Sequence, residues 1–140
     1  MAEFTNSALQ TVAAGGNVTF TETPVRGGNC VVHREGAGVV TLRGLTDQCR
    51  ALYRVSFGGN IAIPTGGTVG EISLALAVEG EPLASATAIV TPAAVEEFSN
   101  VFTSIFVEAP RGCCVTVAVE NTSDQAINVQ NANLIVERVA

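Results

Sequence analysis

Hydrophobic residues alternate with polar or small residues along most of this chain. The clearest run lies between Glu71 and Glu79, where four aliphatic residues share one parity: Ile72, Leu74, Leu76 and Val78. A period of two residues is typical of a β-strand with one buried face, whereas a helix would show a period of 3.6. We therefore predict a strand here, with the four aliphatic side chains pointing into a core.

The last third of the chain predicts two further strands, Cys113–Glu120 and Asn131–Val139, joined by a polar turn. In the first, Val115, Val117 and Val119 share one parity. The second ends the sequence on apolar side chains, and leaving these in water would forfeit about 1.5–3 kcal/mol each. We expect this final segment to be a central strand of a β-sandwich.

The rest of the chain reads as short strands separated by glycine-rich turns. The segments 30–34 and 39–43 flank Glu35-Gly36-Ala37-Gly38 and predict a hairpin. The segment 49–57 places Tyr53 and Phe57 inward, and Gly58-Gly59 predicts a bulge or bend. Eight to ten strands of this kind indicate an all-β antiparallel sandwich. Residues 1–16 are expected to form an N-terminal arm or edge strand, and residues 17–140 a single domain.

The segment from Thr91 to Ala109 fits two patterns. Its apolar residues match a helix face, yet Phe98, Phe102 and Phe106 also share strand parity. The β-branched and aromatic content favours a strand from about Ser99 to Glu108. A helical turn is allowed at residues 92–97, where a proline could occupy the first helical position.

The composition predicts an oligomer. The apolar fraction is 47%, only 14% of residues are charged, and the mean hydropathy is +0.38. No apolar run reaches the length of about 20 residues that a membrane helix needs, so no membrane insertion is expected. The surplus of apolar residues is better explained by a subunit interface, because obligate homo-oligomer interfaces resemble a core cut in half.

The charges argue against nucleic acid as a partner. The net charge is −6, and the seven basic residues are all arginines that are scattered singly along the chain. The N-terminus lacks a basic region followed by an apolar one, so no secretory signal is predicted. If the protein reaches a surface, we expect it to do so from the cytoplasm, by assembly or lysis.

Four cysteines carry the only prospect of a covalent link. By parity Cys49 and Cys113 should point inward as small hydrophobic side chains, while Cys114 should face outward. A link between Cys30 and Cys49, and intermolecular links through Cys114, both stay open.

Catalysis, metals and cofactors are not expected. His33 is the only histidine and lies outside any nucleophile motif, so a catalytic triad and a Cys/His zinc set both lack partners. The paired glutamates at 79/81 and 96/97 flank a turn or point to opposite sides of a strand. These observations predict that the protein is not an enzyme.

Three stretches carry a resemblance to a known family: residues 53–61 (YRVSFGGNI), residues 72–82 (ISLALAVEGEP) and residues 133–140 (NLIVERVA). They resemble the trimeric jelly-roll family shared by complement-type globular heads and tumour necrosis factor. Within that family the likeness is greatest to the C-terminal domains of collagen-like glycoproteins on bacterial spores (the exosporium). The chain has no Gly-X-Y collagen segment, so it departs from those glycoproteins.

The resemblance implies a homotrimeric jelly roll of about ten strands that acts as a structural module, with the last strand near the threefold axis. Its setting would be a spore surface or appendage, with loops that could present binding surfaces. The alternative is a phage virion decoration or fibre-head protein. The partners would be further copies of the chain and a larger surface or virion assembly. We expect the trimer interface to draw on seven residues: Tyr53, Phe57, Phe98, Phe102, Phe106, Leu134 and Val136.

Overall fold

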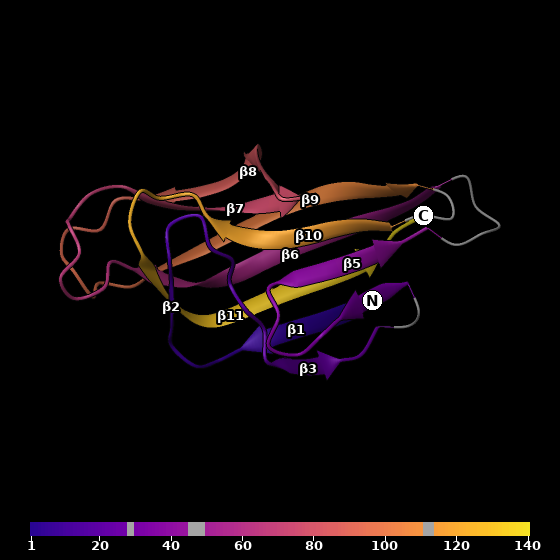
Figure 1. Ribbon diagram of the computed structural model, residues 1–140, viewed down its shortest axis with the longest axis horizontal. Helices are drawn as coiled ribbons and strands as arrows, with labels where there is room; N and C mark the ends of the chain where they lie inside the picture. The colour runs from indigo at the N-terminus through magenta and orange to yellow at the C-terminus, as the bar shows by residue number, and fades with distance from the viewer. Residues whose placement is uncertain (28–29, 45–49, 111–113) are drawn as a thin grey trace.

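The computed structural model describes residues 1–27, 30–44, 50–110 and 114–140. These residues form eleven strands in two antiparallel sheets that pack face to face (Figure 1). They include no helix with the length and hydrophobicity that a membrane crossing requires. The prediction of an all-β antiparallel sandwich is confirmed, with eleven strands where about ten were expected.

Sheet A is built from the strands of one layer in the order β3-β1-β11-β6-β9, and β2 also pairs with β11. Its strands are β1 (Ala2–Asn6), β2 (Gln10–Val12), β3 (Glu22–Val25), β6 (Arg50–Ala62), β9 (Ser99–Pro110) and β11 (Ile127–Arg138). Sheet B has the order β4-β5-β10-β7-β8. Its strands are β4 (Val31–His33), β5 (Val39–Arg43), β7 (Ile72–Val78), β8 (Glu81–Val90) and β10 (Cys114–Asn121).

The chain changes sheet repeatedly in its second half, as a jelly roll requires. It passes from β6 in sheet A to β7 and β8 in sheet B, then to β9, β10 and β11 in alternate sheets. Strands β10 and β11 each have a neighbour on both sides. The prediction that the end of the chain forms a central strand is therefore confirmed, because β11 lies between β1 and β6.

The core lies between the sheets and follows the predicted parity. Ile72, Leu74 and Leu76 of β7 have no exposed surface, and neither have Tyr53 and Phe57 of β6. The hairpin predicted around Glu35–Gly38 is confirmed as well, since β4 and β5 pair in antiparallel register. One periodic pattern therefore supplied both the strands and their buried faces.

Within the segment 1–16, β1 lies between β11 and β3 and buries Ala2 and Phe4, whereas β2 pairs with β11 alone and is an edge strand. Two local expectations differ from the structure. Residues 92–97 form bends and a turn but no helix. The bulge expected at Gly58-Gly59 lies on the partner strand, where Asn131 has a φ of 57°. Gly59 lies opposite this bulge, and a Cβ there would lie 3.1 Å from Phe57 Cζ, a tight contact that glycine avoids.

Candidate functional site

The outer face of sheet A carries large exposed aromatic side chains. Along β9 the inward residues Val101, Thr103 and Val107 are buried. The alternate residues Phe102 and Phe106 point outward and are 67% and 64% exposed. The strand period therefore places both rings on the solvent side of sheet A.

Neighbouring residues of β6 and β11 surround these rings. Gly58 lies opposite Phe102, and a Cβ on it would lie 3.9 Å from the ring, so Phe102 is positioned over bare backbone. Next to it Ser56 Oγ and Ser104 Oγ are 2.9 Å apart, and Arg54 Nη2 donates to Glu137 Oε1 at 3.1 Å. We call this surface the aromatic face and define it by the following residues: Met1, Arg54, Ser56, Phe102, Ser104, Phe106, Ile135 and Glu137.

The aromatic face combines a shallow apolar hollow with polar neighbours. Met1, Phe102 and Ile135 line a shallow hollow of about 490 Å³ together with polar neighbours from β6, β9 and β11. Exposed phenylalanines beside serines and an ion pair match the composition of protein interfaces, in which aromatic anchors are surrounded by polar groups.

The structure divides the seven residues that were predicted for the interface. Phe102 and Phe106 lie on the aromatic face, and Phe98, just before β9, is 41% exposed. The other four are completely buried between the sheets of one chain and have no surface to offer a second chain: Tyr53, Phe57, Leu134 and Val136. The alternation along a strand divides its residues into two sets that point to opposite sides. It does not say which of the two sets the second sheet covers.

Tyr53 instead stabilises one end of the sandwich. Its hydroxyl donates to the carbonyl oxygen of Arg43 at 2.7 Å, and the carbonyl oxygen of Cys30 lies 3.4 Å away. Burial and the neighbouring Cys30 side chain raise the pKa of the Tyr53 phenol to about 12, against 10.0 in water. The nearby Arg138 guanidinium and the bond to Arg43 act in the opposite direction but do not cancel the effect.

We expect the fold to lose stability between pH 10 and pH 12. In the unfolded chain Tyr53 ionises near 10, whereas the folded chain keeps the proton up to about 12. The contribution is therefore complete below pH 10 and falls by about 3 kcal/mol as the pH rises through 12. Because the chain has one tyrosine, a titration of phenolate absorbance reports Tyr53 alone. If the pH midpoint of this titration were the same for the folded protein as for the protein unfolded in urea, the prediction would be wrong. The control is Tyr53→Phe, which has no tyrosine and should give no phenolate signal.

The predicted cross-linking cysteines are only partly described. Cys30 is half-buried, and Arg138 Nη1 lies 3.9 Å from its Sγ. Cys114 is exposed at the start of β10, on the outward side that its parity predicted. Cys49 and Cys113 lie outside the described residues, so a Cys30–Cys49 link stays a prediction.

His33 is positioned by packing. Its ring centroid lies 4.6 Å from that of Phe4 and 6.3 Å from that of Phe20, and its Nε2 is 2.9 Å from the carbonyl oxygen of Ala37. These contacts join the hairpin of β4 and β5 to β1 and to the segment that follows β2. Within the ranges that the model describes, three or more His, Cys, Asp or Glu side chains nowhere converge as metal ligands would.

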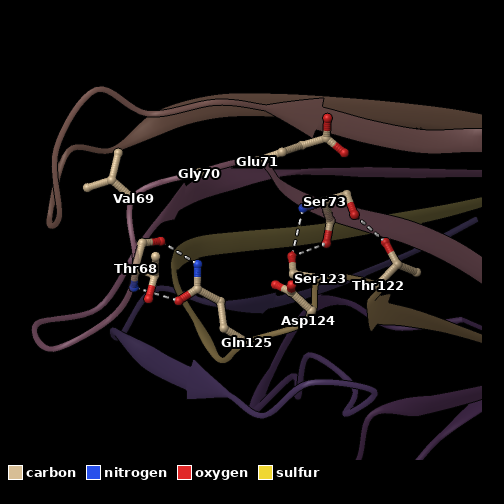
Figure 2. A pocket seen from close by; sticks show the side chains of 9 residues that line it. All are labelled: Thr68, Val69, Gly70, Glu71, Ser73, Thr122, Ser123, Asp124 and Gln125. Carbon is tan, nitrogen blue, oxygen red and sulfur yellow. Dashed lines mark hydrogen bonds between the residues drawn. The ribbon is translucent and has the colours of Figure 1, made fainter.

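A second site lies at the end of the sandwich where the β6–β7 loop meets the β10–β11 turn, at the left of Figure 1. Here residues 68–71, 73 and 122–125 line an open hollow of about 620 Å³, which we call the loop-end hollow (Figure 2). Thr68 N donates to Gln125 Oε1 at 2.9 Å, and Gln125 Nε2 donates to Thr68 O at 2.7 Å. The Gln125 side chain therefore links the turn to the loop through two hydrogen bonds, one from each polar atom of its amide group.

Asn121 holds the β10–β11 turn beside the loop-end hollow. It is fully buried at the end of β10, and its Nδ2 donates to the carbonyl oxygens of Val12 and Gln125 at 3.0 and 2.9 Å. Its Oδ1 accepts from Ser123 N at 2.9 Å. Sequence reasoning missed this residue and the hollow. The available signal was an asparagine at an inward strand position before a Thr-Ser-Asp turn, where its side chain needs backbone partners.

No model of a known protein family matches the sequence, and no curated protein matches it either. Solved structures share its fold. The Eiger TNF of S. frugiperda matches with a TM-score of 0.70 at 16% identity, over 99% of this chain and 91% of that chain. The globular domain of a zebrafish complement 1qA protein matches with a TM-score of 0.59 at 12% identity, over 96% and 94% of the two chains. The PRD1 vertex protein P5 matches with a TM-score of 0.55 at 13% identity, over 99% and 96%.

These likenesses define the class of fold. The chain is a jelly roll of the kind found in tumour necrosis factor and the complement heads, and it covers nearly the whole length of those domains. At identities of 12–16% the comparison establishes the fold, and any function must be argued from the two sites described above.

Proposed function

We propose that this chain is a non-enzymatic structural module that assembles as a homotrimer through the aromatic face. The observation that carries the proposal is the exposure of two phenylalanines, 67% for Phe102 and 64% for Phe106, on one face of sheet A. Covering a large apolar side chain stabilises an assembly by about 1.5–3 kcal/mol per ring. A second copy of the chain is the partner that the low charge content and the sequence resemblance both favour.

The setting we propose is a surface assembly. The resemblance to collagen-like spore glycoproteins supports a bacterial spore surface or appendage, and this finer likeness depends on the sequence stretches alone. The likeness to a protein named as the vertex protein of PRD1 supports the alternative, a virion decoration or fibre-head protein. Neighbouring genes distinguish the two, because sporulation genes would favour the first and capsid or tail genes the second.

The mass of the native particle in solution tests the assembly. We expect light scattering to give three times the 14.4 kDa mass of one chain, with and without reductant. A monomer would contradict the proposal. A larger particle that falls apart on reduction would replace it with a disulfide-linked coat, for which Cys30 and Cys114 would be the thiols to substitute.

A further inference from the structure

The loop-end hollow presents oxygen atoms to solvent and no positive charge. Two carboxylates, those of Glu71 and Asp124, stand among its nine lining residues, and none of the nine is basic (Figure 2). Carboxylates accept hydrogen bonds and do not donate them when ionised. A ligand that fits this hollow must therefore supply the donors, and an anionic ligand would be repelled.

Some polar atoms of the loop-end hollow are already used in internal hydrogen bonds, and others remain open to a ligand. Ser123 Oγ accepts from Ser73 N at 2.8 Å and donates to Ser73 O at 3.2 Å, so its proton is used. The hydroxyls of Ser73 and Thr122 lie 2.6 Å apart and share one hydrogen bond, which leaves the proton of one hydroxyl available. In the described part of the chain, the Glu71 and Asp124 carboxylates have no ion pair.

These internal bonds also make the hollow rigid. The Gln125 side chain links loop to turn, and Ser123 links turn to β7, so the polar atoms are held in place before a ligand arrives. Preorganisation lowers the entropy that binding must overcome. The volume of about 620 Å³ falls within the range of about 300–1,000 Å³ that is typical of small-molecule sites.

We propose that the loop-end hollow binds saccharides, prefers amino sugars and excludes uronic acids. Sugar hydroxyls and ammonium groups supply the donors that the two carboxylates require, and a sugar oxygen can accept the free proton of the Ser73–Thr122 hydroxyl pair. All the lining residues belong to one chain, so this binding does not depend on the trimer proposed above. A failure of one proposal therefore leaves the other in place.

The test is a titration of the ¹⁵N-labelled protein followed by its amide NMR signals. The probes are trimers of glucosamine, N-acetylglucosamine and galacturonic acid, together with putrescine, a diamine without hydroxyls. We expect the glucosamine trimer to shift the amide signals of Thr68, Ser73 and Gln125 in a saturable way at millimolar concentrations. The N-acetylglucosamine trimer should bind more weakly, and the galacturonic acid trimer should leave these signals unchanged.

Charge-removing variants assign the binding to named carboxylates. Asp124→Asn keeps the size of the side chain and should weaken binding of the glucosamine trimer about tenfold, the effect of losing one charge-assisted hydrogen bond. Glu71→Gln should weaken it in the same direction. The matched control is Glu81→Gln, another exposed carboxylate about 20 Å away beyond the other end of β7, which should leave binding unchanged.

Three results would overturn the proposal. The first is the absence of shifts in these signals with both glucosamine-based trimers. The second is equal binding of the galacturonic acid trimer or of putrescine, since that would show no selection for a donor-rich sugar. The third is unchanged affinity in both Asp124→Asn and Glu71→Gln while their spectra show the native fold.

Discussion

The double variant Phe102→Ser, Phe106→Ser is expected to be a folded monomer at concentrations where the unmodified chain is a trimer. Both rings point away from the core and are 67% and 64% exposed, so their removal leaves the packing between the sheets intact. Burying each ring against a neighbour contributes about 1.5–3 kcal/mol. Losing two rings in each subunit should therefore weaken association by at least about a hundredfold.

Light scattering on matched samples measures this change, and thermal unfolding confirms that the variant remains folded. The control is Val39→Ser, Ile89→Ser, which removes two aliphatic side chains that are 41% and 60% exposed on sheet B. We expect the control to remain a trimer. If the control dissociates as well, or if the phenylalanine variant keeps the full mass, the aromatic face is not the interface.

Leu76→Asp is expected to prevent folding. Leu76 has no exposed surface and lies on β7, which pairs with β10 on one side and β8 on the other. The substitution removes about 2–5 kcal/mol of apolar packing and places a carboxylate where no partner can neutralise it. Since a domain of this size is stable by only about 5–15 kcal/mol, the sum is comparable to its total stability.

Circular dichroism and urea unfolding measure the effect of Leu76→Asp. The expected result is insoluble protein, or soluble protein without a cooperative transition. The matched control is Ile89→Asp, the same kind of change on neighbouring β8, where the side chain is 60% exposed. We expect that variant to unfold within about 0.5 kcal/mol of the unmodified chain, as surface substitutions do. A folded Leu76→Asp would show that the assigned inward face of β7 is wrong.

The strands themselves were predictable because their signal is local. Side chains two residues apart point to the same side, so Ile72, Leu74 and Leu76 define a buried face without knowledge of any other strand. The prediction that the final segment, β11, is a central strand had another source, namely the cost of leaving its apolar side chains in water. The helical turn at residues 92–97 was wrong, because a proline after a threonine is only a weak start signal and no helix followed.

The position of the aromatic residues was not predictable from parity. Phe102 and Phe106 form the bulkiest apolar set on β9, and yet Val101, Thr103 and Val107 face the core instead. The register with β6 decides this, because Tyr53 pairs with Val107 and Phe57 with Thr103. Large inward rings on β6 leave room opposite for smaller side chains only. The outward face of β9 could then carry phenylalanines over Gly58, where a partner would cover them.

By itself, the sequence determined the fold class, most of the strands and the inward side of those with one clearly apolar face, such as β7, because period, turn residues and apolar content act over a few residues. Only the tertiary structure decided which aromatic residues reach the surface and where a site forms. Gln125 bonds to Thr68, and Ser123 to Ser73, across about fifty intervening residues. Contacts that distant depend on how two sheets are stacked and in which register, and no pattern within one segment encodes them.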